Sequence, residues 1–273
     1  MQKKIKLSVL IPIYNSAQFL TDSINSILNQ TFKDFELLLL DDCSTDGSFE
    51  FISQIKDKRV KVFRNDKNLG ISTTRNKLID LATGEYLAIM DNDDISLPTR
   101  FEHQIKFLDN NPDVSVVGTW TELFCKTKNK INPIKKLITN LGWIWTQPQT
   151  ATIYDCLTAS VVMHTSAMIR AKDLKQYNIK YKKEYTPAED YKLWADILSS
   201  GLKIKNIPLI LTKYNLHGSN FSILQKKRLK KSDKKIKEDI KSFLKIPNKK
   251  QKPYLFNIIN KLRIKYFLRK HYD

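Results

Sequence analysis

Short apolar runs alternate with amphipathic helical patterns along the first third of the chain, and this alternation constrains the fold more than any other feature. Four runs are rich in leucine, isoleucine and valine and have the length of buried strands. They span residues 7–13, 35–40, 60–63 and 86–90. Between them, apolar residues recur at helical spacing, and the segments concerned are 16–30, 46–56 and 72–82. Strands that alternate with helices predict an α/β fold with a mainly parallel, Rossmann-like sheet flanked by helices.

Polar residues cluster where three of these strands end. Tyr14 and Asn15 follow the first run, Asp41 and Asp42 follow the second, and residues 91–94 follow the fourth. The carboxyl ends of parallel strands share one edge of a sheet, and open α/β sheets bind their ligands there. The three clusters are therefore expected to form one ligand site.

The acidic cluster Asp91-Asn92-Asp93-Asp94 comes directly after a buried run. Carboxylates at the end of a buried strand are costly unless a positive group faces them. A strand end or tight turn can aim Asp91 and Asp93 at one site, and hard oxygen ligands suit Mg²⁺ or Mn²⁺ bound to substrate phosphates. The alternative is a solvated turn with Asp94 or Ser96 as the N-cap of a helix that has Pro98 in its first turn.

The rest of the folded body is less regular. Strands are expected at 114–120 and 204–214, and a helix at 189–200 that ends at Gly201. Residues 126–150 are polar and lysine-rich and are expected to form a loop, whereas 158–169 are apolar and strand-like around His164.

Composition limits the class of protein and its compartment. The 273 residues are 41% hydrophobic, which fits a folded protein, and no apolar stretch reaches the roughly 20 residues of a membrane-spanning helix. The three cysteines are scattered and offer neither a disulfide framework nor a CxxC metal site. A reducing compartment, the cytoplasm, is the expectation.

The net charge of +19 is concentrated in a tail, residues 223–273. Residues 226–273 contain 18 Lys+Arg against four Asp+Glu. Basic amphipathic helices of this kind suit an anionic membrane surface. A merely solvated face and nucleic-acid binding are the alternatives, and the apolar stripes beside the lysines count against nucleic acid. The stripes are Leu229, Ile236, Ile240 and Phe243, then, after Pro247, Leu255, Ile258, Ile259, Leu262 and Tyr266.

Several motifs in a fixed order resemble the family 2 glycosyltransferases of bacterial surface-glycan synthesis. The resemblance covers about residues 5–222 and implies a GT-A fold, a nucleotide-sugar donor, Mn²⁺ or Mg²⁺, and inversion at the anomeric carbon. It implies a nucleotide-sugar-binding half (1–115) and an acceptor-binding half (116–222) of one domain, followed by the tail. The motifs are Ser8–Asn15, Ser26–Thr31, Leu40–Ser48, Asn68–Gly70, Arg75-Asn76, Thr83–Tyr86, Asp91–Asp94 and Glu189–Trp194.

The resemblance also implies which residues bind the nucleotide. Asp42 matches the position that hydrogen-bonds the base, and a carboxylate accepts from the imide N–H of uracil, so UDP is expected. A helix N-cap is the alternative for Asp42, a strand-to-helix turn for Tyr14 and Asn15, and a solvated helix residue for Arg75. The full nucleotide-binding set is Pro12, Tyr14, Asn15, Asp42, Arg75, Asp91 and Asn92.

By the same resemblance, Asp93 is the metal ligand, and Asp91 contacts the sugar nucleotide directly or through the metal. His217, in a loop after the last body strand, is the third candidate for the metal or the diphosphate. A plain loop histidine is the alternative.

Asp190 is the expected general base, because a sugar hydroxyl must lose its proton as it attacks. Glu189 is the adjacent acid that could share this role or bind the acceptor. The alternative for both is a first-turn acid favoured by the helix dipole. His164 is assigned either to the acceptor pocket or to the core as a satisfied histidine.

The expected function is thus an inverting, metal-dependent glycosyltransferase, peripheral on the inner face of the plasma membrane. It would move a sugar from a UDP-sugar to a hydroxyl of a lipid-linked or other surface glycan, such as lipopolysaccharide, capsule or O-antigen, and would not bind nucleic acid. One alternative is a nucleotidyltransferase, which would want a glycine-rich phosphate loop where this chain has Pro12-Ile13-Tyr14-Asn15. The other is a non-catalytic nucleotide- or glycan-binding subunit associated with the membrane.

Overall fold

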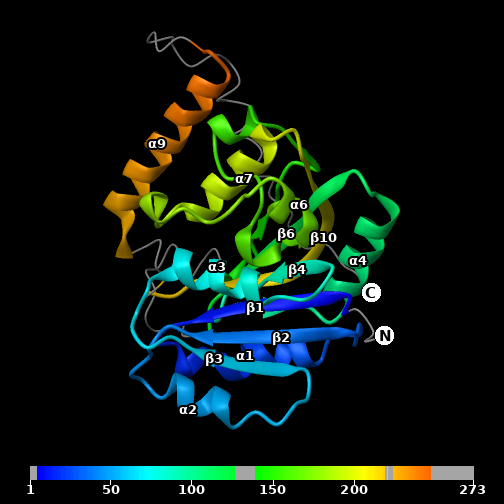
Figure 1. Ribbon diagram of the computed structural model, residues 1–273, viewed down its shortest axis with the longest axis vertical. Coiled ribbons are helices and arrows are strands. Elements are labelled where there is room, and N and C mark those ends of the chain that lie inside the picture. Colours follow the sequence, from blue (N-terminus) through cyan, green and yellow to red (C-terminus); the bar gives the residue numbers. More distant parts are fainter. Residues whose placement is uncertain (1–4, 127–138, 219, 221–223, 247–273) are drawn as a thin grey trace.

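The computed structural model describes residues 5–126, 139–218, 220 and 224–246. A ten-stranded sheet runs through this part of the chain, with helices on both faces (Figure 1). The strands are β1 (Leu7–Ile13), β2 (Phe35–Asp41), β3 (Val60–Arg64), β4 (Tyr86–Ile89), β5 (Ile95–Ser96), β6 (Val114–Phe124), β7 (Ile144–Trp145), β8 (Thr150–Ala151), β9 (Met168–Arg170) and β10 (Lys203–Asn215). The helices are α1 (Ala17–Leu28), α2 (Ser48–Ser53), α3 (Ile71–Leu81), α4 (Arg100–Asn110), α6 (Ala171–Gln176), α7 (Glu189–Ser199) and α9 (Lys226–Phe243), with 3₁₀ turns η2 (Asp155–Leu157), η3 (His164–Ser166) and η4 (Lys183–Tyr185).

The sheet has the order β3-β2-β1-β4-β9-β6-β10-β5. Strands β3, β2, β1 and β4 are mutually parallel, as the alternation of strands and helices predicts. The short strand β9 is antiparallel to both of its neighbours, β4 and β6, and β10 is parallel to β6. Strand β9 therefore joins the first part of the chain to the second within one continuous sheet.

Two apolar clusters cover the two faces of the sheet, and successive residues of one strand belong to different clusters. On β1, Leu10 packs in the cluster that includes residues of α3, α7 and α9, whereas Val9 and Ile11 pack with α1 and α4. Because both faces are buried, β1 and β2 are apolar at nearly every position instead of alternating.

Several short elements differ from the sequence expectations. Helix α4 begins at Arg100 with Thr99 as its N-cap, so the alternative of an N-cap at Asp94 or Ser96 is wrong; Ser96 belongs to β5, which pairs with β10. His164 lies in the turn η3 before β9 and not in a strand. The expected loop at 126–150 contains β7 and the first residue of β8, while its residues 127–138 lie outside the described part.

A buried carboxylate on β2 holds three segments together. Glu36 accepts hydrogen bonds from Ser8 on β1 (2.6 Å), from the backbone and hydroxyl of Thr83 (2.8 Å each) and from Lys61 on β3 (2.7 Å). A Cβ at Gly84 would lie 2.5 Å from the backbone nitrogen of Ser8, so only glycine fits there. Burial alone would raise the pKa of Glu36, but these hydrogen bonds outweigh it and lower the pKa below its ordinary value of 4.5.

Replacing Glu36 by glutamine is expected to lower the free energy of unfolding by about 2 kcal/mol at pH 7, because the donor groups of Ser8, Lys61 and Thr83 lose a charged acceptor. A carboxyl group whose pKa is lower in the folded than in the unfolded protein stabilises the fold at pH values above its unfolded pKa. This stabilisation is lost as the pH falls through the folded-state pKa. The difference between the two proteins should therefore shrink as pH falls below 4.5. Chemical denaturation at several pH values measures this, with the exposed Glu50→Gln as control; a difference independent of pH would contradict the assignment.

The first tail helix, α9, packs on the body. Ile236 and Ile240 are buried in the same cluster as α7, and Leu229 packs against it, while Phe243 is 54% exposed. Most of the expected apolar stripe thus contacts protein. The second expected stripe lies outside the described residues. No helix in the described part is long and apolar enough to span a membrane.

Candidate active site

The predicted nucleotide-side residues meet at the expected edge of the sheet, where β1, β2 and β4 end. Asn15 has a left-handed backbone (φ 47°), and its side-chain oxygen accepts from the Thr45 backbone N–H (2.9 Å). The Asn92 side chain donates to the Pro12 carbonyl (3.0 Å), which ties the acidic turn to the end of β1. Tyr14 is 50% exposed, so its ring is available to a ligand.

Asp42 is buried and organises the loop before α3. Its carboxylate accepts from the Asn65 side chain (2.8 Å) and from the backbone N–H groups of Leu69 and Gly70 (2.9 Å each). Two of these bonds fix the Leu69-Gly70 part of the Asn68-Leu69-Gly70 motif against the end of β2. Asp42 does not cap α2, whose N-cap is Gly47; the Ser48 backbone N–H at the start of that helix donates to Asp46 (3.0 Å).

Arg75 bridges two distant parts of the chain, and its side chain, 11% exposed, is not that of a solvated helix residue. Its guanidinium donates to Glu189 on α7 (2.6 Å) and to Asp91 after β4 (2.9 Å), and it lies over the Tyr181 ring at 5.4 Å. Burial opposes its charge, but Asp91 and Glu189 outweigh burial and raise the pKa of Arg75. The guanidinium therefore stays charged between the two carboxylates.

His164 makes the second contact with Asp91. Its Nδ1 lies 3.4 Å from the Asp91 carboxylate and its Nε2 lies 2.9 Å from the Tyr181 hydroxyl. Burial alone would raise the pKa of Asp91, but His164 and Arg75 outweigh it and lower that pKa. His164 is therefore a buried histidine with both ring nitrogens partnered, as the satisfied-core alternative expects, and one of its partners is the acidic turn.

Asp93 turns toward a different partner from Asp91. One of its carboxylate oxygens lies 2.8 Å from Nε2 of His217, whose ring stacks on Phe19 at a centroid distance of 4.6 Å. Asp94 is fully buried and accepts from the Asn215 backbone N–H (2.8 Å). Burial and the charges of Asp93 and Asp91 raise the pKa of Asp94.

The side chains at this turn offer a divalent cation only part of its ligands. No three His, Cys, Asp or Glu side chains in the described residues are grouped closely enough to hold a metal ion by themselves. Asp93 and His217 supply one oxygen and one nitrogen side by side, next to the buried carboxyl of Asp94, whose pKa is raised by burial and by the charges of Asp93 and Asp91. Because Mg²⁺ and Mn²⁺ commonly take further ligands from substrate phosphates and water, this pair fits such an ion.

The two acids that begin α7 differ in their surroundings. Glu189 is 4% exposed and bonded to Arg75, and burial raises its pKa, with Arg75 opposing. Asp190 is partly exposed, and within the described residues its carboxylate forms no hydrogen bond or ion pair. The helix dipole acts on both acids but does not explain the pairing of Glu189 with Arg75.

Sequence reasoning missed Tyr181, which contacts both His164 and Arg75. Asn76 holds the Tyr181 backbone by two hydrogen bonds of 2.9 Å, which explains why Asn76 follows Arg75 in the motif. Tyr181 lies in an irregular segment between α6 and η4, where no periodicity marks it.

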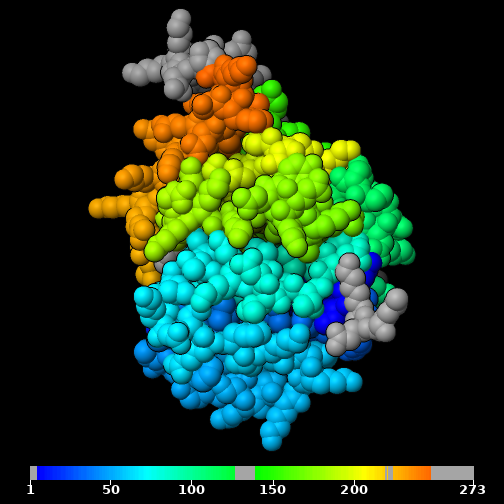
Figure 2. Space-filling view, in the orientation of Figure 1, coloured from blue at the N-terminus to red at the C-terminus, as the bar shows by residue number. Residues whose placement is uncertain are grey.

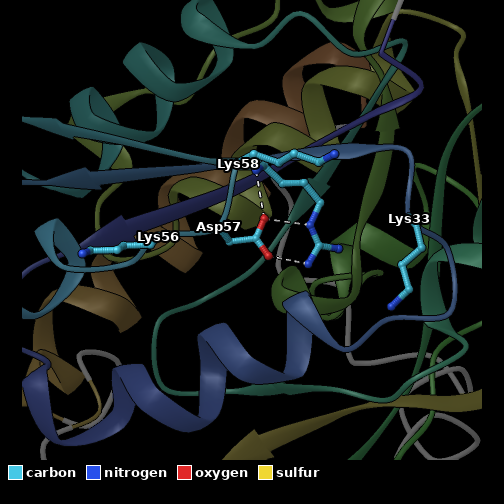
Figure 3. A pocket seen from close by; sticks show the side chains of 5 residues that line it. Lys33, Lys56, Asp57 and Lys58 are labelled. Carbon is cyan, nitrogen blue, oxygen red and sulfur yellow. Dashed lines mark hydrogen bonds and ion pairs between the residues drawn. The ribbon is translucent and has the colours of Figure 1, made fainter.

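A hollow at the opposite edge of the sheet shares no residue with this site (Figure 3). It lies where β2 and β3 begin. Arg59 there is held by Asp57 (2.7 and 3.0 Å), so this arginine is structural. The hollow is lined by Lys33, Lys56, Asp57, Lys58 and Arg59.

Comparison with known proteins places the chain in a family. The model of glycosyl transferase family 2 matches residues 8–177, and the chain belongs to this family. An uncharacterized glycosyltransferase of Haemophilus influenzae is 31% identical over 237 residues, which cover 85% of this chain and 72% of the relative. The Escherichia coli UDP-Glc:alpha-D-GlcNAc-diphosphoundecaprenol beta-1,3-glucosyltransferase WfaP is 28% identical over 223 residues, covering 82% of each chain.

Solved structures confirm the GT-A fold. Staphylococcus aureus TarS 1-349 in complex with UDP-GlcNAc superimposes with a TM-score of 0.64 at 21% identity over 79% of this chain and 60% of that one. The mannosyltransferase PcManGT of Pyrobaculum calidifontis, in complex with GDP-Man and Mn²⁺, gives a TM-score of 0.60 at 14% identity over 95% of this chain and 80% of that one. Family membership leaves the nucleotidyltransferase alternative without support.

Proposed function

We propose that the protein is an inverting glycosyltransferase that moves a sugar from a UDP-sugar to a hydroxyl of a lipid-linked surface glycan, with Mn²⁺ or Mg²⁺. The observation that carries this proposal is the Arg75 bridge. It brings the acidic turn after β4 and the first turn of α7 within the span of one guanidinium. A donor-side group and the candidate base Asp190 are thereby held in one site.

The choice of UDP rests on Asp42 and on relatives. An ionised carboxylate has about four acceptor positions, so the three bonds from the 65–70 loop leave room for a uracil imide N–H. Tyr14, half exposed at the end of β1, would contact the base or ribose. The E. coli relative is named for UDP-Glc, and the TarS structure holds UDP-GlcNAc.

Asp93 and His217 would hold the metal ion, while Asp91 would face the sugar nucleotide through its pairing with Arg75 and His164. When bound, the ion neutralises the charge that develops on the departing diphosphate. Fixed by Asp91 and Glu189, Arg75 adds a permanent positive charge to the same edge of the site.

Asp190 would accept the proton of the acceptor hydroxyl as its oxygen attacks the anomeric carbon. The bond between the anomeric carbon and the UDP oxygen breaks from the opposite side, and its electron pair leaves with UDP. One displacement of this kind inverts the configuration. Glu189 keeps its pair with Arg75 and does not take the proton.

The proposal is tested by measuring UDP release from a set of UDP-sugars by the purified protein, with Mn²⁺, Mg²⁺ or EDTA. One donor should be turned over with metal, and EDTA should reduce the rate by about 100-fold or more, because the leaving group loses its neutralising charge. Undiminished turnover in EDTA would contradict the metal assignment. Turnover of GDP-sugars but not of UDP-sugars would contradict the assignment of a UDP-sugar as the donor.

A polyprenyl-linked acceptor would place the enzyme at the inner face of the plasma membrane. The name of the E. coli relative includes such an acceptor, a GlcNAc-diphosphoundecaprenol. Because this acceptor's lipid stays in the bilayer, an enzyme that uses it gains by binding the membrane surface.

A further inference from the structure

We infer that the outward face of α9 is a docking surface for an anionic lipid bilayer and that it binds mainly through lysine charges. The inference rests on the proposed function for its biological reason, a lipid-linked acceptor. Its physical basis is independent and consists of the way α9 is fixed and of the side chains that it turns outward.

The inner face of α9 is occupied by the protein itself. Ile236 and Ile240 are at most 2% exposed. Asp239 accepts from the Tyr185 hydroxyl (2.6 Å) and pairs with Lys192 of α7 (3.5 Å). The apolar stripe therefore cannot enter a membrane while α9 stays packed on the body, so α9 cannot bind by inserting its apolar face, as amphipathic helices usually do.

The outer face of α9 is almost purely basic. At 100° per residue, the side opposite Ile236 carries the exposed Lys227, Lys230, Lys231 and Lys234. Glu238, the exposed acid on this side, lies 3.7 Å from Lys234, and Asp233 pairs with Lys237 (2.8 Å). Lys227, Lys230 and Lys231 form no ion pair among the described residues.

The shape and position of α9 suit a broad charged plane. Its 18 residues make a straight rod of roughly 27 Å at the periphery of the molecule, and its side chains project from the surface (Figures 1 and 2). Each lysine near an anionic bilayer raises the affinity of the protein for that bilayer roughly fivefold, and the contributions of several neighbouring lysines combine. Just before the helix, Leu224 is 65% exposed and would enter the headgroup region. An exposed apolar side chain beside the lysines favours lipid over nucleic acid.

The test is flotation of the full-length protein with vesicles of phosphatidylglycerol and phosphatidylcholine (3:7), compared with pure phosphatidylcholine. The protein should bind the anionic vesicles, dissociate from them in high salt, and not bind the neutral vesicles. The variant Lys227→Glu, Lys230→Glu, Lys234→Glu should weaken binding by about 100-fold or more. The matched control Lys33→Glu, Lys56→Glu, Lys58→Glu, at the hollow of Figure 3, removes the same net charge and should bind nearly normally.

Equal losses in both variants would show that net charge and not α9 governs binding, and would overturn the inference. Retained binding in the α9 variant, or binding to neutral vesicles, would also overturn it. Duplex DNA that displaces vesicles at equal phosphate would identify nucleic acid as the partner instead. UDP release is measured on both variants as well. Because vesicle binding needs no turnover, a failure of the membrane inference can be distinguished from a failure of the proposed glycosyl transfer.

Discussion

Substitution of Asp190 by asparagine is expected to lower sugar transfer by about 10²- to 10⁴-fold, the usual contribution of a general base. The amide has nearly the shape of the carboxylate but cannot accept the proton of the acceptor hydroxyl. UDP binding should persist, because the groups assigned to the nucleotide lie at the ends of β1 and β2, on α3 and in the turn after β4, and not on α7. The measurements are initial rates of transfer and calorimetric binding of UDP with Mn²⁺.

The matched control is Glu184→Gln, which removes an exposed acid from η4, just before α7. It should keep near-normal activity. The melting temperature of the Asp190→Asn variant should also stay close to that of the parent, since Asp190 is partly exposed and unpaired within the described residues. Full transfer by Asp190→Asn would remove it as the base, and UDP binding without turnover in the parent would instead indicate a binding subunit.

Substitution of Arg75 by leucine is expected to cost both activity and stability. The change leaves Asp91 and Glu189 in a largely buried position without their shared cation, and breaking a buried ion pair from one side costs about 3–5 kcal/mol. Transfer should fall by about 100-fold or more, because the two sides of the site lose their common partner. Denaturant unfolding and transfer rates measure the two effects.

Two further variants sharpen this prediction. Arg75→Lys keeps the charge but cannot donate to both carboxylates in one plane, so it should recover stability better than activity. Arg59→Met, at the other edge of the sheet, breaks a partly exposed arginine pair with Asp57 and should cost only about 1 kcal/mol. A loss at Arg75→Leu no larger than at Arg59→Met would show that the bridge does not organise the site.

Local sequence patterns were sufficient for the parallel part of the sheet. The runs at 7–13, 35–40, 60–63 and 86–90 all form strands. The first, second and fourth are apolar nearly throughout because both of their faces are covered, whereas β3 lies at the edge of the sheet and is only partly buried. The two-residue strands β5, β7 and β8 were not found, since two residues carry no periodicity. Strand β9, three residues long, was recognised as apolar, but its antiparallel insertion between β4 and β6 has no local signal.

The order of strands and helices in the sequence was enough to predict that the polar clusters meet at one edge of the sheet, because parallel strands joined by helices end there and the clusters follow those ends. Tertiary structure decided which charges meet. Arg75 and Glu189 are 114 positions apart, and Asp91 pairs with Arg75 and His164 while Asp93 pairs with His217. Such pairings depend on how distant segments of the chain pack together and on which carboxylates are buried and therefore require a cation nearby. The spacing of neighbouring residues predicts neither.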